Sequence, residues 1–103
     1  MSFNPQAGRE QGGRRPALVL SPPAYNRKVG LALCCPVTSQ IKNYPFEVSI
    51  PAGLPVAGVV LADHWKSLDW RARHAEFSGA RLPAEAVSEV VSLIAALLTD
   101  EGG

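Results

Sequence analysis

The apolar residues of this chain fall into short segments, and proline, glycine or polar residues separate each segment from the next. Residues 17–20, 29–37 and 56–62 are the clearest segments, and two adjacent prolines follow the first of them. Short apolar segments that end in this way predict β-strands. A chain built from such strands buries its apolar side chains by pairing the strands into a small sheet.

Residues 44–50 have the alternating pattern of a strand with one wet face. Phe46, Val48 and Ile50 are on the apolar side, whereas Glu47 and Ser49 are on the polar side. We expect the apolar side to face the core, and we interpret the start of this segment, residues 44–46, as structural.

The last part of the chain changes to a helical period. Pro83 suits the first turn of a helix, and Glu85 suits its positively polarised N-terminal end. One helical face is aliphatic and carries Val87, Val90, Val91, Ile94, Leu97 and Leu98. The sequence predicts a helix over residues 84–98, whose wide apolar face covers the sheet and in part packs on a second copy of the protein.

Together these elements predict a mainly β protein with a C-terminal helix, folded as one domain over residues 1–103. The sheet is expected to be small and strongly bent, or closed into a barrel. Residues 1–13 are polar and glycine-rich and are interpreted as a flexible loop. Residues 24–28 are interpreted as a turn, and residues 75–77 as a further short strand.

Charge is distributed unevenly along the chain, although the formal net charge is only +1. Up to Arg81 there are ten Lys and Arg against five Asp and Glu, and from Leu82 onward there are four acidic residues and no basic ones. A basic body admits a polyanionic partner, whereas an acidic terminal helix repels one. We therefore expect any nucleic-acid surface to lie away from the C-terminus.

Several kinds of site are disfavoured by the motifs that the sequence lacks. His64 and His74 have no Cys or acidic cluster at metal-ligand spacing, and there is no HExxH, CxxC, P-loop, GxGxxG or GxSxG motif. Cys34 and Cys35 are neighbours, between which a disulfide is strained, so they are interpreted as reduced core residues. We expect no metal, no cofactor, no membrane span and a cytoplasmic location.

The first apolar segment has a cationic head, in the sequence RRPALVLSP over residues 14–22. Arg15 stands at the end of the predicted strand, where a rigid sheet fixes a side chain that solvent and substrate still reach. The glycine-rich loop before it carries a second ionisable pair, Arg9 and Glu10. This loop and strand are the candidate site.

A polar set, Thr38, Ser39 and Gln40, follows the second apolar segment. An arginine fork combined with hydroxyl or backbone donors binds phosphate, and it stabilises charge on a pentavalent phosphorane. From the residues alone an alternative stays open, in which the arginines are solvated at the rim of the sheet and the polar set forms a turn.

Four stretches, taken in order, resemble one known family. RRPALVLSP, AYN, CCPVTSQIKNYPFEV and LADHWKSLDWRAR resemble the MazF (PemK-like) family of toxin endoribonucleases, from about Phe3 to the terminal helix. The resemblance implies an SH3-like small barrel of the PemK/CcdB type that forms homodimers. Members begin with a strand of the GDIVWVDF type, whose end corresponds to residues 2–5, so the chain is expected to lack this N-terminal strand.

The resemblance also implies an activity. Members cut single-stranded RNA (mRNA) at short specific sequences without a metal, through attack by the neighbouring 2′-hydroxyl, which leaves a 2′,3′-cyclic phosphate and a 5′-hydroxyl. A MazE-type antitoxin holds them inactive by laying its acidic, disordered tail in the RNA groove. Both partners agree with the basic body of this chain.

Position by position, Arg15 is the arginine of the family's RP motif, Thr38 is the threonine after the CPV-like strand, and Glu10 matches an acidic residue of the glycine-rich loop. A free guanidinium keeps its proton at ordinary pH, so an arginine is poorly suited to act as the base. The implied catalytic roles are therefore phosphate stabiliser and general acid for Arg15, donor to a phosphate oxygen for Thr38, and base or loop orienter for Glu10.

Two further sets of residues are expected to make contacts. The candidates for RNA binding are Phe3, Arg9, Arg14, Ser39, Gln40 and Lys42, with Phe3 as a base-stacking residue. The candidates for the dimer interface, for which RNA binding is the alternative, are Asp63, Lys66, Ser67 and Trp70.

Two rival functions stay open. Gyrase-poisoning toxins of the CcdB type share the implied fold and act through an aromatic C-terminal end, whereas this chain ends in Asp100, Glu101, Gly102 and Gly103. A degenerate member would bind RNA or antitoxin without cutting, which the presence of Arg15 and Thr38 disfavours. The sequence defines neither the cleavage sequence nor the antitoxin, because base readout in single-stranded RNA depends on groove shape.

Overall fold

The structure is a computed structural model that describes residues 3–4, 16–76 and 79–99, with side chains from residue 16 onward. Its elements in chain order are β1 (Phe3–Asn4), β2 (Ala17–Val19), α1 (Pro23–Val29), β3 (Leu31–Thr38), β4 (Glu47–Ser49), β5 (Val59–Leu61), the 3-10 helix η1 (Ala62–His64), β6 (Lys66–Asp69) and α2 (Ala84–Thr99). A mainly β protein with a C-terminal helix is thereby confirmed. The terminal helix begins at the predicted residue and ends one residue later.

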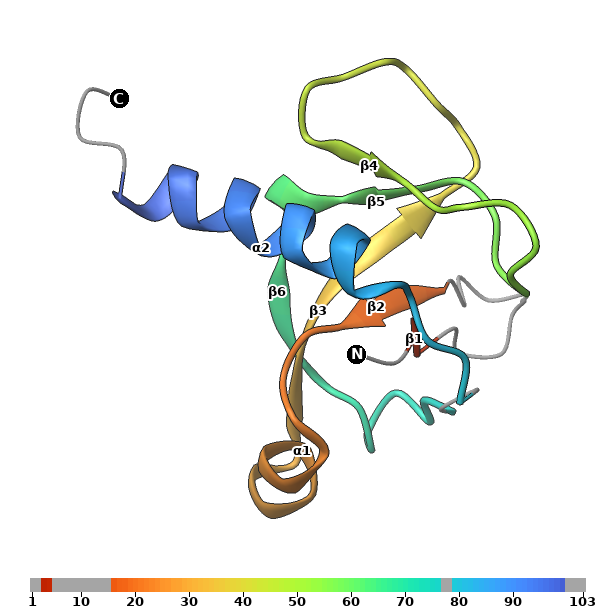
Figure 1. Ribbon diagram of the computed structural model, residues 1–103. Helices are drawn as coiled ribbons and strands as arrows, with labels where there is room; N and C mark the ends of the chain where they lie inside the picture. The colour runs from red at the N-terminus through yellow and green to blue at the C-terminus, as the bar shows by residue number, and fades with distance from the viewer. Residues whose placement is uncertain (1–2, 5–15, 77–78, 100–103) are drawn as a thin grey trace.

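The described strands form one antiparallel sheet in the order β1-β2-β3-β5-β4, and β6 pairs with β3 beside this path. β3 is the central strand and pairs with three others, β2, β5 and β6 (Figure 1). Its first half, Leu31 to Cys34, pairs with β6, and its last two residues, Val37 and Thr38, pair with β5. Within the described residues the sheet is open, because β1 and β4 lie at its two ends.

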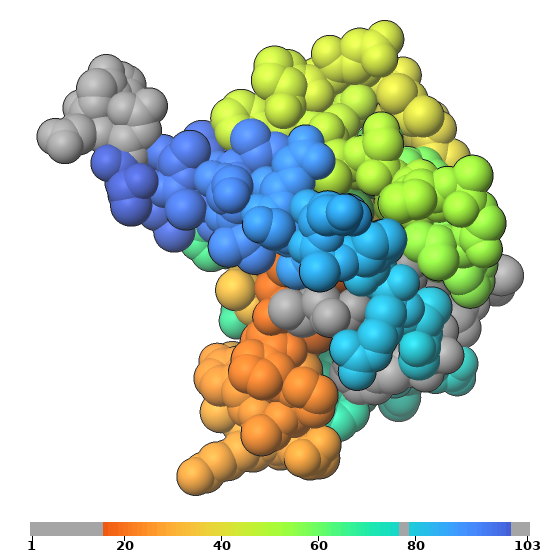
Figure 2. Space-filling model, viewed as in Figure 1, coloured from red at the N-terminus to blue at the C-terminus, as the bar shows by residue number. Residues whose placement is uncertain are grey.

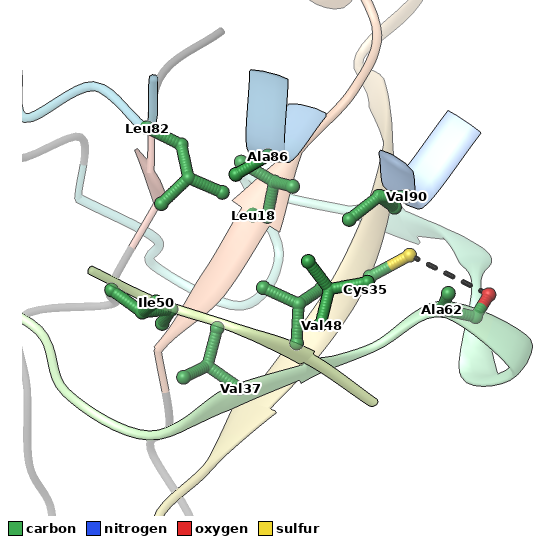
Figure 3. Packing of buried hydrophobic residues seen from close by; sticks show 10 residues of the cluster. Leu18, Cys35, Val37, Val48, Ile50, Ala62, Leu82, Ala86 and Val90 are labelled. Carbon is green, nitrogen blue, oxygen red and sulfur yellow. Dashed lines mark hydrogen bonds between the residues drawn. The ribbon is translucent and has the colours of Figure 1, made fainter. Parts of the chain in front are cut away.

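The core lies between the sheet and α2, which crosses one face of the sheet (Figure 1). Leu18 and Cys35 from the sheet pack with Ala86 and Val90 from the helix (Figure 3). The opposite face buries a smaller cluster, Ala17, Val19, Ala32 and Cys34, beneath Leu68 and Trp70. Both faces of β2 are therefore covered, which explains why its sequence is continuously apolar rather than alternating.

Only part of the predicted apolar face of α2 is buried in the chain. Val90 is fully buried, and Val87 and Ile94 pack against the core, but Val91 is half exposed and Leu98 is 65% exposed. The reason is visible in Figures 1 and 2, where the C-terminal half of α2 extends past the edge of the sheet.

The predicted turn over residues 24–28 is wrong, because these residues belong to α1. The two prolines were interpreted as the end of a strand, yet Pro23 occupies the first turn of a helix, where its missing N–H costs nothing. Gly30 ends the helix in a left-handed conformation (φ 83°), and its N–H donates to the Asn26 carbonyl at 2.9 Å. The second strand consequently begins at Leu31 rather than at residue 29.

The structure also differs from the sequence-based expectation around residues 66–77. Lys66–Asp69 form the strand β6, which the sequence did not predict because three of its four residues are exposed and polar. The short strand expected at 75–77 is absent from the described residues 75 and 76, which are irregular. The strand conformation of β6 is determined by its backbone pairing with β3, which offers an unpaired edge, and not by a side-chain pattern of its own.

The two cysteines give a testable pH dependence. Both are free and buried, and burial raises the thiol pKa from its ordinary value of 9.0 to about 11 for Cys34 and to about 12 for Cys35, where the charges of Cys34 and Asp63 add to the effect. The folded state thus keeps protons that the unfolded chain releases above its ordinary thiol pKa. We expect the urea midpoint to be unaffected by the thiols at pH 7.5 and to fall between pH 9 and 11.

The control is thiol reactivity with a chromogenic disulfide reagent at pH 8. The thiols of the native protein should react slowly with the reagent, whereas both thiols of the denatured protein should react at once. Rapid labelling of the native protein would contradict the burial of these thiols.

Candidate active site

Thr38 is the last residue of β3, at the point where the sheet ends and the chain turns toward β4. Its Oγ1 accepts a hydrogen bond from the backbone N–H of Gln40 at 3.1 Å. This bond fixes the side chain and leaves the hydroxyl hydrogen for another acceptor. Thr38 can therefore donate to an anionic oxygen held in front of the strand end.

A pocket of about 260 Å³ lies beside Thr38. Three of its lining residues, Thr38, Gln40 and Lys42, are among those predicted from the sequence, whereas Ser39 is exposed and does not line it. The other lining residues, Tyr44, Glu47, Leu61 and His64, were not predicted as site residues. The pocket thus joins the β3–β4 segment, drawn in yellow at the top of Figure 1, to the end of β5.

Glu47 holds the segment that forms one wall of this pocket. Its Oε2 accepts a hydrogen bond from the Lys42 N–H at 3.0 Å, and its Oε1 accepts one from the Tyr44 N–H at 3.3 Å. Asn43, between these two residues, has a left-handed backbone (φ 58°), a conformation that asparagine tolerates better than most residues. The Glu47 carboxylate is thereby used to shape the backbone.

Tyr44 is linked to η1 at the opposite side of the pocket. Its hydroxyl donates a short hydrogen bond to Asp63 Oδ2, and this bond is the largest reason why the pKa of Tyr44 is raised. The other carboxylate oxygen, Oδ1, is buried without a hydrogen-bond partner and lies 3.8 Å from His64 Nε2. Asp63 was predicted at the dimer interface, and here its side chain supports two residues that line the pocket.

Gly58 allows the loop after β4 to pack against the backbone of Thr38. A Cβ on Gly58 would lie 2.1 Å from the Thr38 carbonyl oxygen and 2.9 Å from its carbonyl carbon. Gly58 also has a φ of 120°, a conformation that other residues rarely adopt. The position of Thr38 therefore depends on a glycine 20 residues later in the chain.

Four predicted residues, Arg9, Glu10, Arg14 and Arg15, lie outside the described residues, as does the side chain of Phe3. The nearest described residue is Pro16, whose carbonyl accepts a hydrogen bond from the Val37 N–H at 3.1 Å. Ala17, the first residue of β2, lies opposite Pro36, two positions before Thr38.

The remaining residues predicted for the dimer interface are in or beside β6. Lys66 and Ser67 are exposed, so they stay available as contacts. Trp70 is half-buried, and its Nε1 donates to the Asn26 carbonyl at 3.0 Å, which anchors the turn after β6 to α1. Arg71 lies over the Trp70 ring and donates to the Arg27 carbonyl at 2.9 Å.

Two kinds of feature are absent from the part of the chain that the structure describes. No group of three or more His, Cys, Asp or Glu side chains there is arranged to hold a metal ion. No helix in this part has the length and the apolar composition needed to cross a membrane.

Comparison with known proteins gives consistent matches. Residues 1–98 match the family model described as PemK-like, MazF-like toxin of type II toxin–antitoxin system. The endoribonuclease toxin MazF of Escherichia coli K12 is 52% identical over 85 residues, which cover 82% of this chain and 76% of MazF. The endoribonuclease PemK of Escherichia coli is 35% identical, with 96% of this chain and 77% of PemK covered.

Solved structures give the same result. MazF from Deinococcus radiodurans (Form-I) is 61% identical, with a TM-score of 0.80, and 94% of this chain and 89% of that one are covered. A MazE–MazF complex from the same organism (Form-III) matches with a TM-score of 0.82 and 52% identity, covering 94% and 90%. The chain therefore belongs to the PemK-like, MazF-like toxins of type II toxin–antitoxin systems.

Proposed function

We propose that this chain is an endoribonuclease toxin that cuts single-stranded RNA, with mRNA as its cellular substrate, at a short specific sequence. The relatives with which it shares most of its length are named endoribonucleases. The observation that carries the proposal is the Thr38 hydroxyl, which is held at the edge of a pocket with its hydrogen free to donate. Such a donor suits the phosphate oxygen of a bound RNA strand.

The reaction that fits these residues is an internal transesterification. The 2′-hydroxyl oxygen of one nucleotide forms a bond to the adjacent phosphorus, and the bond to the 5′-oxygen of the next nucleotide breaks. The proton of the 2′-hydroxyl passes to a base, and an acid protonates the leaving 5′-oxygen. The products are a 2′,3′-cyclic phosphate and a 5′-hydroxyl. The step consumes no water and requires no metal ion.

In this scheme Arg15 neutralises the phosphorane and supplies the proton to the leaving group, and Thr38 donates to a phosphate oxygen. Glu10 serves as the base or orients the loop. The arrangement of the described backbone supports the pairing of Arg15 with Thr38, because the Pro16 carbonyl is bonded to the residue before Thr38. A guanidinium supplies the positive charge, so the scheme needs no metal ion.

The RNA strand is proposed to contact the predicted set Phe3, Arg9, Arg14, Ser39, Gln40 and Lys42. Support comes from Gln40 and Lys42, which line the pocket beside Thr38. A MazE-type antitoxin is the proposed inhibitor, as in the MazE–MazF complexes to which the chain is similar. We propose that the toxin acts in the cytoplasm, where mRNA is found.

A homodimer with Asp63, Lys66, Ser67 and Trp70 near its interface, and completion of the sheet as an SH3-like barrel, are also proposed. The barrel is supported by β3, which pairs with β2 and β6 along one stretch and with β5 along the next, as in a strand shared by two bent sheets.

Thr38→Val tests the proposed reaction, because valine has the same shape as threonine and lacks the donor. We expect kcat for cleavage of an unstructured RNA to fall about 10²–10³-fold, the cost of losing one donor to a developing oxyanion. Thr38→Ser should keep most of the activity, and Ser49→Ala, which removes an exposed hydroxyl from β4, should have no effect.

The melting temperature of each variant separates folding from chemistry. A folded Thr38→Val protein that cuts at the wild-type rate would contradict the role of Thr38. A folded wild-type chain that makes no cuts would favour the non-catalytic binder, either of the gyrase-poison type or as a degenerate RNA or antitoxin binder.

A further inference from the structure

Asp63 lies behind two side chains that face the same pocket. Tyr44, which precedes β4, donates its hydroxyl to Asp63 Oδ2, and His64, the neighbour of Asp63 in η1, has its Nε2 3.8 Å from Oδ1. Both Tyr44 and His64 line the pocket, whereas Asp63 does not. The carboxylate therefore joins two pocket walls that come from segments 19 residues apart.

Tyr44 is held by three interactions, and part of its surface nevertheless remains exposed to solvent. Its backbone N–H is bonded to Glu47 and its hydroxyl to Asp63, and its ring packs against Phe46 with centroids 5.9 Å apart at 55°. Even so, 42% of the residue is exposed. An aromatic ring that is held in place with part of its surface open is a stacking platform that needs no ordering when a ligand binds.

The other lining residues supply hydrogen-bonding groups around this ring. Gln40 offers a donor and an acceptor, Lys42 offers donors only, and His64 offers one of each when neutral. Both oxygens of Glu47 are occupied by backbone N–H groups, so this carboxylate is engaged in shaping the wall. An aromatic surface beside several polar groups is what proteins use to bind an unstacked base of single-stranded RNA.

The volume of the pocket limits the size of the ligand that it can bind. At about 260 Å³ it is below the range of roughly 300–1,000 Å³ that is usual for small-molecule ligands. It therefore suits a single planar group rather than a run of nucleotides. Because Thr38 lines the same pocket, that group would be attached to the nucleotide next to the phosphate that Thr38 contacts.

We propose that this pocket binds one nucleobase of the substrate RNA beside the cleaved bond and so determines one position of the cleavage sequence. Tyr44 stacks on the base, and His64 contacts its edge. Asp63 is a positioning residue that holds both. The inference rests on the proposed RNA cleavage and adds to it the residues that select the base.

The test is a cleavage map on a randomised RNA pool, with KM and kcat measured on the best wild-type sequence. Tyr44→Ala should raise KM about 5- to 150-fold, the loss expected for one stacked base. It should also flatten the base preference at one position only. His64→Gln should change the preferred base at that same position, with kcat on the newly preferred sequence close to wild type.

Matched controls are available within the chain. Tyr25 on α1 is also 42% exposed, and His74 is an exposed histidine outside the pocket, so Tyr25→Phe and His74→Gln should leave the cleavage map unchanged. Tyr44→Phe keeps the ring and loses only the bond to Asp63, so its effect should be smaller than that of Tyr44→Ala.

The role of Asp63 is tested by comparing two substitutions. Asp63→Ala should flatten the same position of the map, whereas Asp63→Asn keeps an acceptor for the Tyr44 hydroxyl and should restore most of the preference. Light scattering on both variants shows whether the oligomer is unchanged. A flattened map that appears only when the oligomer dissociates would overturn the positioning role.

The two proposals fail in different ways. If wild type and the pocket variants cut with the same map, the pocket is not a base site, although the cleavage proposal stands. If wild type makes no cuts, the cleavage proposal fails, and binding of an uncleavable 2′-deoxy oligonucleotide is then measured by fluorescence anisotropy. Equal affinity of wild type and Tyr44→Ala in that assay would overturn the base site as well.

Discussion

Arg15→Ala should lower the rate of RNA cleavage by about 10³-fold or more while the melting temperature stays unchanged. The reason is that the guanidinium neutralises charge which develops only in the transition state, and arginines in such positions contribute about 10³- to 10⁵-fold in phosphoryl transfer. The measurement is kcat on a defined RNA, with circular dichroism to verify the fold.

One companion variant separates the fork geometry of Arg15 from its charge, and a second is a control at another arginine. Arg15→Lys keeps the charge but loses the planar fork, so it should remain strongly impaired. Arg81→Ala removes an exposed arginine far along the chain and should cut normally. Arg15→Ala with near-normal kcat and a raised KM would show that the residue only binds the RNA, which would contradict its place in the reaction.

Gly58→Ala should destabilise the protein by about 3 kcal/mol or more, which for a domain of this size lowers the melting temperature by at least about 12 °C. Its Cβ would lie 2.1 Å from the Thr38 carbonyl oxygen, and that oxygen belongs to backbone that pairs with β5, so it has no room to move away. Any protein that still folds must shift Thr38, and we therefore expect its cleavage rate to fall as well.

Gly53→Ala is the matched control for Gly58→Ala. Gly53 also has a positive φ, 93°, but a Cβ there would meet nothing within 4 Å. Its cost should be limited to the backbone conformation, about 1–2 kcal/mol, with normal cleavage per folded molecule. Equal effects of the two substitutions would show that the contact with Thr38 contributes little.

The elements that sequence alone predicted are those whose side-chain pattern matches their burial. β4 buries Val48 and exposes Ser49, as the alternation required, and α2 buries Val90 under its regular apolar spacing. α1 was missed because it is short and held mainly by tertiary contacts: Asn26 is buried, and its carbonyl receives the Trp70 indole N–H. No periodicity reveals contacts between residues 44 positions apart.

The site was predictable where one segment of sequence carries it. Thr38, Gln40 and Lys42 are close together in the chain, and all three line the pocket. The wall formed by Tyr44 and His64 was missed, because it depends on Asp63 meeting Tyr44 across 19 residues.

The sequence does contain features that indicate this wall. Glu47 is on the polar side of an alternating strand, and Asp63 and His64 directly follow a buried one. The end of a buried strand is where rigid structure and solvent access coincide, which is the reasoning that singled out Arg15.

The most direct test is cleavage of a single-stranded RNA in excess EDTA, with the ends of the products identified and a matched substrate carrying one 2′-deoxyribose at the cleaved position. We predict discrete cuts in EDTA, with 2′,3′-cyclic phosphate and 5′-hydroxyl ends, and no cut at the deoxyribose. Cleavage that stops in EDTA, or that continues at the 2′-deoxy position, would contradict attack by the 2′-hydroxyl with arginine in place of a metal.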